Sequence, residues 1–156
     1  MIQPSHPLML KTGTGGLDQN VINRAEKSIE PIIRLIDEDA QQHIANLKNH
    51  IANPSIVTTK NRELLDDLML DLMPLKVNSQ MGENRSLSIL SAKLLKFLEK
   101  INRVNVDSYK IIKSFTEAIE LVASREIKDS NHAFTIAVVN ELDEACNRYY
   151  KKHDAV

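Results

Sequence analysis

The chain has little of what β-rich and disulfide-bonded folds require. Its 156 residues include one cysteine, four glycines and no tryptophan, and aromatic residues make up 4%. Antiparallel sandwiches and barrels use glycine at hairpins and aromatic residues in strands, so this composition disfavours them. A single cysteine forms no intramolecular disulfide. Because Cys146 falls on a helical apolar face, we expect a core residue there and not a nucleophile.

Two further absences bear on partners and compartment. Twenty Lys and Arg residues stand against 21 Asp and Glu, a net charge of -1, so there is no global basic field to attract nucleic acid or an anionic membrane. No uncharged apolar run approaches the roughly 18 residues of a membrane span. The amino terminus also lacks the positive region of a signal peptide. We therefore expect a cytoplasmic protein with no nucleic-acid and no membrane partner.

What the chain does have is helical periodicity, with 42% hydrophobic residues to fill a core. Apolar residues from Ile22 to Ile51 recur every three or four positions, which predicts one long helix with an apolar stripe on one side. We expect Asp18 to cap this helix and Pro31 to kink it. Residues 1–17 lack any period and contain two prolines and three glycines, which indicates an extended arm.

Four more amphipathic segments follow. One begins near Asn61 and is limited by Pro74, and residues 76–85 resemble a connector. The others run from Leu87 to Ile101, from an N-cap at Asp107, and around residues 134–149. We expect an all-α fold, an antiparallel bundle of four to five helices that forms one domain over residues 18–152, with a polar tail at 153–156.

A basic stripe is the best candidate binding surface. Lys93, Lys96, Lys100 and Arg103 follow three-, four- and three-residue steps, which places them along one side of a helix. Such a stripe suits an acidic protein surface or phosphates, although most polar helix faces simply meet water. No aromatic residues interleave with these cations as stacking platforms for bases, so nucleic acid is disfavoured further.

Two histidines offer the alternative chemistry. His43 and His50 are seven residues apart and share a helix side at the margin of the apolar stripe, where one ring nitrogen can stay in water. Histidine phosphotransfer domains place a phosphoryl-accepting imidazole on a bundle helix, with a lysine three residues later and then a glycine. Here the lysine, Lys48, is five residues later and no glycine follows. Phosphotransfer through His43 is therefore the minor hypothesis.

No metal, cofactor or catalytic constellation is expected. Asp39 and His43 share a helix side, but bundles that bind two metals use Glu-x-x-His pairs, which this chain lacks. Asp66, Asp67 and Asp71 could be taken for paired catalytic acids, but on a polar helix face we expect them to be exposed to water.

Three short segments resemble a family of small bacterial all-helical proteins that are often labelled chemotaxis-associated. They are Leu10-Lys11 followed by Gly15-Gly16-Leu17-Asp18, then Pro74-Leu75-Lys76-Val77-Asn78, and Leu94-Leu95-Lys96-Phe97-Leu98-Glu99. The resemblance implies a non-enzymatic module in bacterial signalling or motility control, with a response regulator or a kinase as its partner.

The leading hypothesis is thus a helical adaptor in bacterial signalling. The alternatives are histidine phosphotransfer through His43 and a homodimeric structural bundle. The dimer hypothesis rests on Leu70 and Ile56-Val57, which lie off the apolar stripes and are therefore candidates for exposure.

Overall fold

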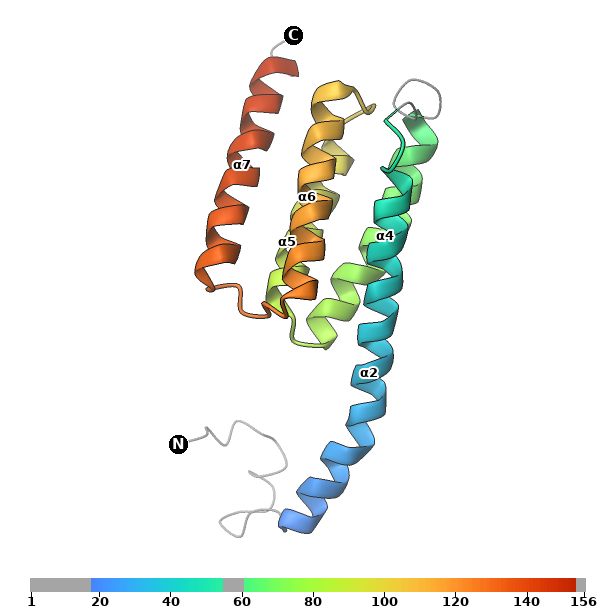
Figure 1. Ribbon diagram of the computed structural model, residues 1–156, viewed down its shortest axis with the longest axis vertical. Helices are drawn as coiled ribbons and strands as arrows, with labels where there is room; N and C mark the ends of the chain where they lie inside the picture. The colour runs from blue at the N-terminus through green and yellow to red at the C-terminus, as the bar shows by residue number, and fades with distance from the viewer. Residues whose placement is uncertain (1–17, 55–60, 154–156) are drawn as a thin grey trace. The chain divides into compact units, whose positions relative to one another are not determined.

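This computed structural model describes residues 18–54 and 61–153, which contain five α-helices and no strand (Figure 1). The expected all-α antiparallel bundle is thereby confirmed, while the proposed arm at residues 1–17 lies outside the described residues. The helices are α2 (Gln19–His50), α4 (Asn61–Met81), α5 (Arg85–Lys100), α6 (Val106–Ser124) and α7 (Ala133–His153).

The chain divides into two compact units, residues 1–35 and 36–156, and α2 spans the boundary. The described part of the first unit is α2 from Gln19 to Leu35. The second unit holds the rest of α2 and the other four helices.

α2 is one helix across Pro31, as its periodicity predicts. Asp18 caps it, because its carboxylate accepts a hydrogen bond from the backbone N–H of Asn20 at 3.1 Å. Only part of the apolar stripe belongs to the core, however. The buried residues begin at Ala40, whereas Ile29 and Ile33 are 49% and 42% exposed. In the first unit no second helix is present among the described residues to cover them.

α4 corrects two expectations. Pro74 does not limit the helix, which continues to Met81, so most of the expected connector at residues 76–85 is helical. Proline has no N–H to donate to the carbonyl of Leu70. The helix nevertheless continues, and Leu75, the residue after the proline, is completely buried. The real turn lies at 82–84, where Glu83 has a φ of 60° and the Asn84 side chain accepts from the backbone N–H of Leu87.

The cap of α6 also differs from the expectation. Asn105, two residues before the expected Asp107, is the N-cap. Its side chain accepts from the backbone N–H of Ser108 at 2.9 Å, and its own N–H donates to the Ser108 hydroxyl at 2.8 Å. This reciprocal pair satisfies two backbone donors at once.

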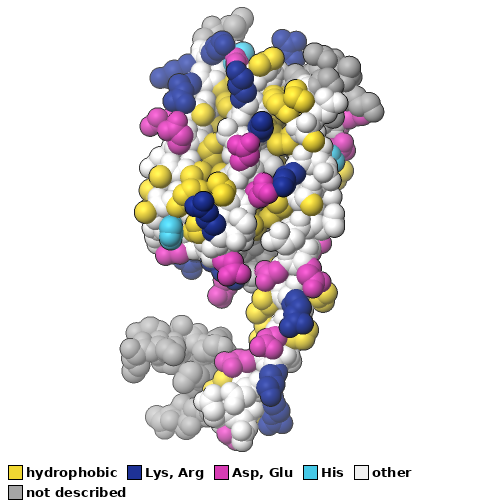
Figure 2. Space-filling view, viewed as in Figure 1, with side chains coloured by type: hydrophobic (Ala, Val, Ile, Leu, Met, Phe, Trp, Pro, Cys, Tyr) yellow, Lys and Arg dark blue, Asp and Glu magenta, His cyan; other side chains and the backbone are white. Residues whose placement is uncertain are grey.

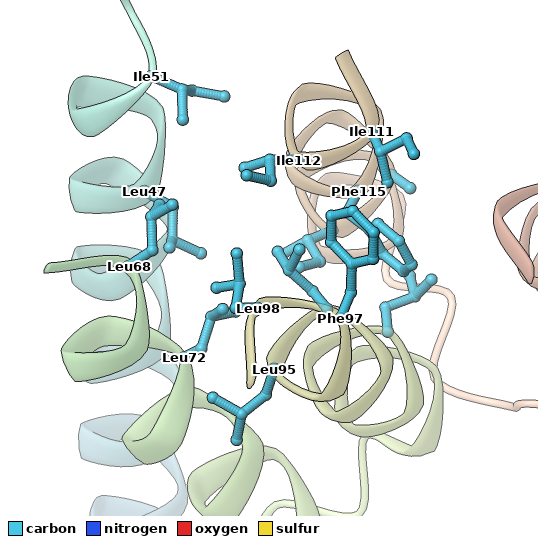
Figure 3. Close-up of a cluster of buried hydrophobic side chains, with 14 of the residues drawn as sticks. Leu47, Ile51, Leu68, Leu72, Leu95, Phe97, Leu98, Ile111, Ile112 and Phe115 are labelled. Carbon is cyan, nitrogen blue, oxygen red and sulfur yellow. The ribbon is translucent and has the colours of Figure 1, made fainter. Parts of the chain in front are cut away.

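The core of the second unit lies around α5, which contacts α4, α6 and α7. Figure 3 shows leucines from α2 and α4 facing leucines and phenylalanines from α5 and α6. α7 adds Leu142, Cys146 and Tyr149 to the same cluster. The largest completely buried side chains include Leu47, Leu68, Leu72, Leu90, Leu94, Phe97, Leu98, Ile112, Phe115 and Ile119.

We expect Leu94→Ala to lower the free energy of unfolding by about 3 kcal/mol, because it removes a completely buried side chain and leaves a cavity. Leu70→Ala is the matched control, since Leu70 is 70% exposed and on a helix of the same unit. Urea denaturation followed by circular dichroism measures both. Equal losses in the two variants would contradict the core described above.

Candidate functional site

The three lysines of α5 line a groove between α5 and α7. Lys93, Lys96 and Lys100 lie on one side, and Asp143 and Tyr150 of α7 lie on the other. The groove has a volume of about 320 Å³, and buried Phe97, Phe115 and Cys146 also line it. It therefore combines a basic rim with apolar walls.

Two of these lysines are already engaged by α7. The ammonium nitrogen of Lys93 lies 2.9 Å from both carboxylate oxygens of Asp143. That of Lys100 lies 4.0 Å from the centre of the Tyr150 ring, a cation–π contact. Tyr150 in turn packs beside Phe97, with ring centres 5.9 Å apart. An aromatic residue does therefore accompany the cations, although it comes from a different helix and one lysine already covers it.

Lys96 differs from its two neighbours. It is exposed, and within the described residues no hydrogen bond or ion pair is seen for it. Its charge is therefore available to a partner at no loss of an internal contact.

Arg103 does not belong to this surface. α5 ends at Lys100, and the C-cap Ile101 has extended backbone angles (φ −91°, ψ 143°), so Arg103 lies in the following loop. The expected four-residue helical stripe is therefore reduced to three lysines. Val104 in this loop is buried, and Asn105 then caps α6.

Cys146 is a buried thiol, as its position on the apolar face predicts. Burial raises its pKa to about 11, and the nearby Asp143 carboxylate also raises it, while Lys93 acts in the opposite direction. A thiol held in its protonated form is a poor nucleophile.

A second polar cluster joins α2 to α4 around Asp71. One carboxylate oxygen of Asp71 accepts from His43 Nδ1 at 2.8 Å and from the Asn46 amide at 3.0 Å. The other lies 2.9 Å from His50 Nε2. The three partners share one side of α2, at steps of three and four residues. The expectation that Asp71 meets water is wrong, because it is 8% exposed and bonded to three side chains.

Burial alone raises the pKa of the Asp71 carboxyl, but the hydrogen bonds from His43, Asn46 and His50 outweigh it. The net result is a pKa below the ordinary value of a carboxyl group. The ionised carboxylate is thus the form that fits this cluster.

His43 has carboxylates at both ring nitrogens. Its Nε2 lies 3.3 Å from Asp39, whose carboxylate also accepts from the Asn78 amide. A neutral imidazole donates to only one of these two acceptors. Lys48, the lysine five residues after His43, bonds Glu120 of α6 at 2.6 Å and not His43. Two flanking carboxylates repel an incoming phosphoryl group, so this geometry favours a structural role for His43.

The remaining surface shows no single dominant sign of charge. In Figure 2, Lys and Arg side chains are interspersed with Asp and Glu over the visible face of the second unit. A hollow of about 830 Å³ near the α4–α5 turn has a balanced lining that includes Glu83, Arg85, Lys128 and Asp129. Such a hollow has no preference for a charged partner.

Other expectations concern metals, membranes and dimers. Within residues 18–54 and 61–153, no cluster of three His, Cys, Asp or Glu side chains is suited to a metal ion. Nor does any helix there have the length and apolarity to cross a membrane. Of the residues that suggest a homodimer, Leu70 is 70% exposed, and Ile56 and Val57 lie outside the described residues.

Comparison with protein-family models, curated proteins and solved structures finds no match. Function must therefore be inferred from the side chains themselves.

We expect Asp71→Asn to lower the free energy of unfolding at neutral pH by about 2 kcal/mol, because three donors lose a buried carboxylate acceptor. The pKa of Asp71 is lower in the folded than in the unfolded chain, where it is about 4. Its contribution is thus complete above pH 4 and is lost as the pH falls through the folded-state pKa. The difference in the free energy of unfolding between wild type and variant, measured by urea denaturation, should therefore decrease as the pH falls below 4. Exposed Asp67→Asn is the control, and an equal effect there would contradict the assignment.

Proposed function

We propose that this chain is a non-enzymatic helical adaptor that binds an acidic surface of a signalling protein in the groove between α5 and α7. The observation that carries this proposal is the arrangement of the three lysines. Lys93 and Lys100 are held by Asp143 and Tyr150, so the groove keeps its shape, while exposed Lys96 between them lacks an internal partner among the described residues. A preorganised cationic rim above apolar walls suits an acidic segment with an apolar anchor.

The absence of an activated nucleophile supports the non-enzymatic half of the proposal. Cys146 is buried with a raised pKa, and His43 is engaged by Asp71 and Asp39. Cys146 and His43, the two candidate groups considered above, thus each have a structural role.

The signalling context of the proposal comes from the resemblance to chemotaxis-associated helical proteins. A response regulator or a kinase is the partner that this resemblance implies. An acidic patch on such a protein is the complement that Lys93, Lys96 and Lys100 require.

We expect Lys96→Glu to abolish recovery of the partner in a pulldown from native lysate, because the reversed charge faces the partner's acids. Lys113→Glu is the matched control, since it makes the same charge change at an exposed position of α6 outside the groove. A protein recovered by wild type and Lys113→Glu, and missing with Lys96→Glu, supports the groove. Equal recovery of the partner by wild type and both variants would exclude the groove as the binding site.

Phosphotransfer through His43 remains the alternative function, and it is separable by experiment. We expect no acid-labile phosphate on the chain after incubation with a phosphorylated response regulator, because carboxylates face both ring nitrogens of His43. Label that is present in wild type and absent in His43→Gln would establish phosphotransfer and replace the adaptor proposal.

A further inference from the structure

Ser88 of α5 is a buried polar residue whose hydroxyl has no hydrogen-bond partner among the described residues. It is 9% exposed, and it lines the hollow of about 830 Å³ near the α4–α5 turn. Its backbone N–H is bonded to the carbonyl of Asn84 at 3.0 Å, but its hydroxyl is not. In the described part of the chain no completely enclosed side-chain oxygen or nitrogen lacks a partner, so the Ser88 hydroxyl is open to the hollow.

The other buried serines of the described residues are all bonded. The hydroxyls of Ser79, Ser91 and Ser108 each donate to a backbone carbonyl three or four residues earlier. That of Ser86 donates to the carbonyl of Asp129 at 2.9 Å. Serines in helices commonly bond to the preceding turn in this way. A buried polar group without such a bond is costly unless something outside the chain bonds to it, and Ser88 is in that position.

The hollow is held in shape by Ser86, which is completely buried. Its backbone N–H donates to the carbonyl of Lys128 at 3.1 Å, and its hydroxyl lies 2.9 Å from that of Thr135. Together with the bond to Asp129, these contacts fix the loop between α6 and α7 against the start of α5. Figure 1 shows that loop and the α4–α5 turn at the same end of the second unit. A site whose walls are already fixed loses little entropy when it binds a ligand.

The charges that line the hollow are balanced, and most of them have no partner. Arg85 and Lys128 are cations, and Glu83 and Asp129 are acids. Within the described residues no ion pair is seen for Glu83, Arg85 or Lys128, and all three are exposed. Asp129 uses one carboxylate oxygen to accept from the backbone N–H of Asn131 at 2.9 Å. A ligand that carries one positive and one negative group can use both signs at once.

The uncharged part of the lining restricts the ligand further. Ile89 and Ala92 provide apolar contacts, and no aromatic side chain lines the hollow. A nucleobase or another planar ring would therefore find nothing to stack on. The volume lies in the range of small-molecule sites, roughly 300 to 1,000 Å³. A small aliphatic zwitterion fits these properties better than a nucleotide or a polyanion does.

We propose that this hollow binds a free amino acid, the simplest small zwitterion. Its carboxylate pairs with Arg85 and Lys128 and accepts a hydrogen bond from the Ser88 hydroxyl. Its ammonium group faces Glu83 and Asp129. The site is separate from the adaptor function, because the hollow and the basic groove share no lining residue.

The experiment follows the amide signals of the isotope-labelled full chain by NMR while the standard L-amino acids are added, one at a time. We expect at least one of them to shift the signals of Arg85, Ser88 and Lys128 in a saturable way. The N-acetyl and the carboxamide forms of that amino acid are the matched probes, since each lacks one of the two charges. We expect each form to bind about tenfold more weakly or worse.

Ser88→Ala tests the unpartnered hydroxyl. We expect it to weaken binding of the amino acid by about tenfold and to leave the urea denaturation midpoint unchanged, because no bond within the chain is lost. Ser91→Ala is the matched control, since it makes the same change on the same helix outside the hollow, and we expect it to leave binding unchanged.

Lys128→Gln tests the charge in the same way, with exposed Lys113→Gln of α6 as its control. We expect about tenfold weaker binding for the first variant and no change for the second. Circular dichroism establishes that each variant is folded.

Three results would overturn the proposal. One is that no amino acid shifts the signals of the hollow. Another is that the N-acetyl or the carboxamide form binds as tightly as the parent amino acid, which would mean that one charge suffices. The third is an equal loss of binding in Ser88→Ala and Ser91→Ala, which would place the ligand elsewhere.

Discussion

The enclosure of α5 is the constraint on which the rest of the second unit depends. Nine of its sixteen residues are buried, and it contacts α4, α6 and α7. A helix enclosed this far keeps only a narrow strip for charged side chains, because a cation in the core would be costly to desolvate. Lys93, Lys96 and Lys100 occupy that strip, next to α7. The packing that forms the core thus also gathers the cations at one groove.

The helices could be predicted from the sequence because helical periodicity is local. The unbroken phase across Pro31 and the cap at Asp18 are both visible in the residues themselves. The extent of α4 is not, since the cost of a proline inside a helix is offset by packing beyond it, here the burial of Leu75, and that packing depends on distant parts of the chain. Asn105 and Asp107 are both good N-caps, and only the structure shows that Ser108 completes the capping box with the first.

The candidate sites show the same division between local and distant information. The spacing of the three lysines and of the two histidines is local, so both groups could be found. Their partners could not, because Asp143 lies 50 residues beyond Lys93, and Asp71 lies 28 and 21 residues beyond His43 and His50. In the sequence alone, where those contacts are not visible, Asp71 cannot be distinguished from Asp66 and Asp67. Three acids on one short segment therefore differ in role although the sequence presents them alike.

The near-zero net charge acquires a different meaning once the charges are placed on the helices. It is a sum over separated charges, with the lysines of α5 beside α7 and the exposed acids Asp66 and Asp67 on α4. A local group of like charges discriminates between partners by repelling groups of its own sign at that place. A neutral composition therefore excludes a global electrostatic binder, but it leaves room for a local group of charges, because three lysines still line one groove.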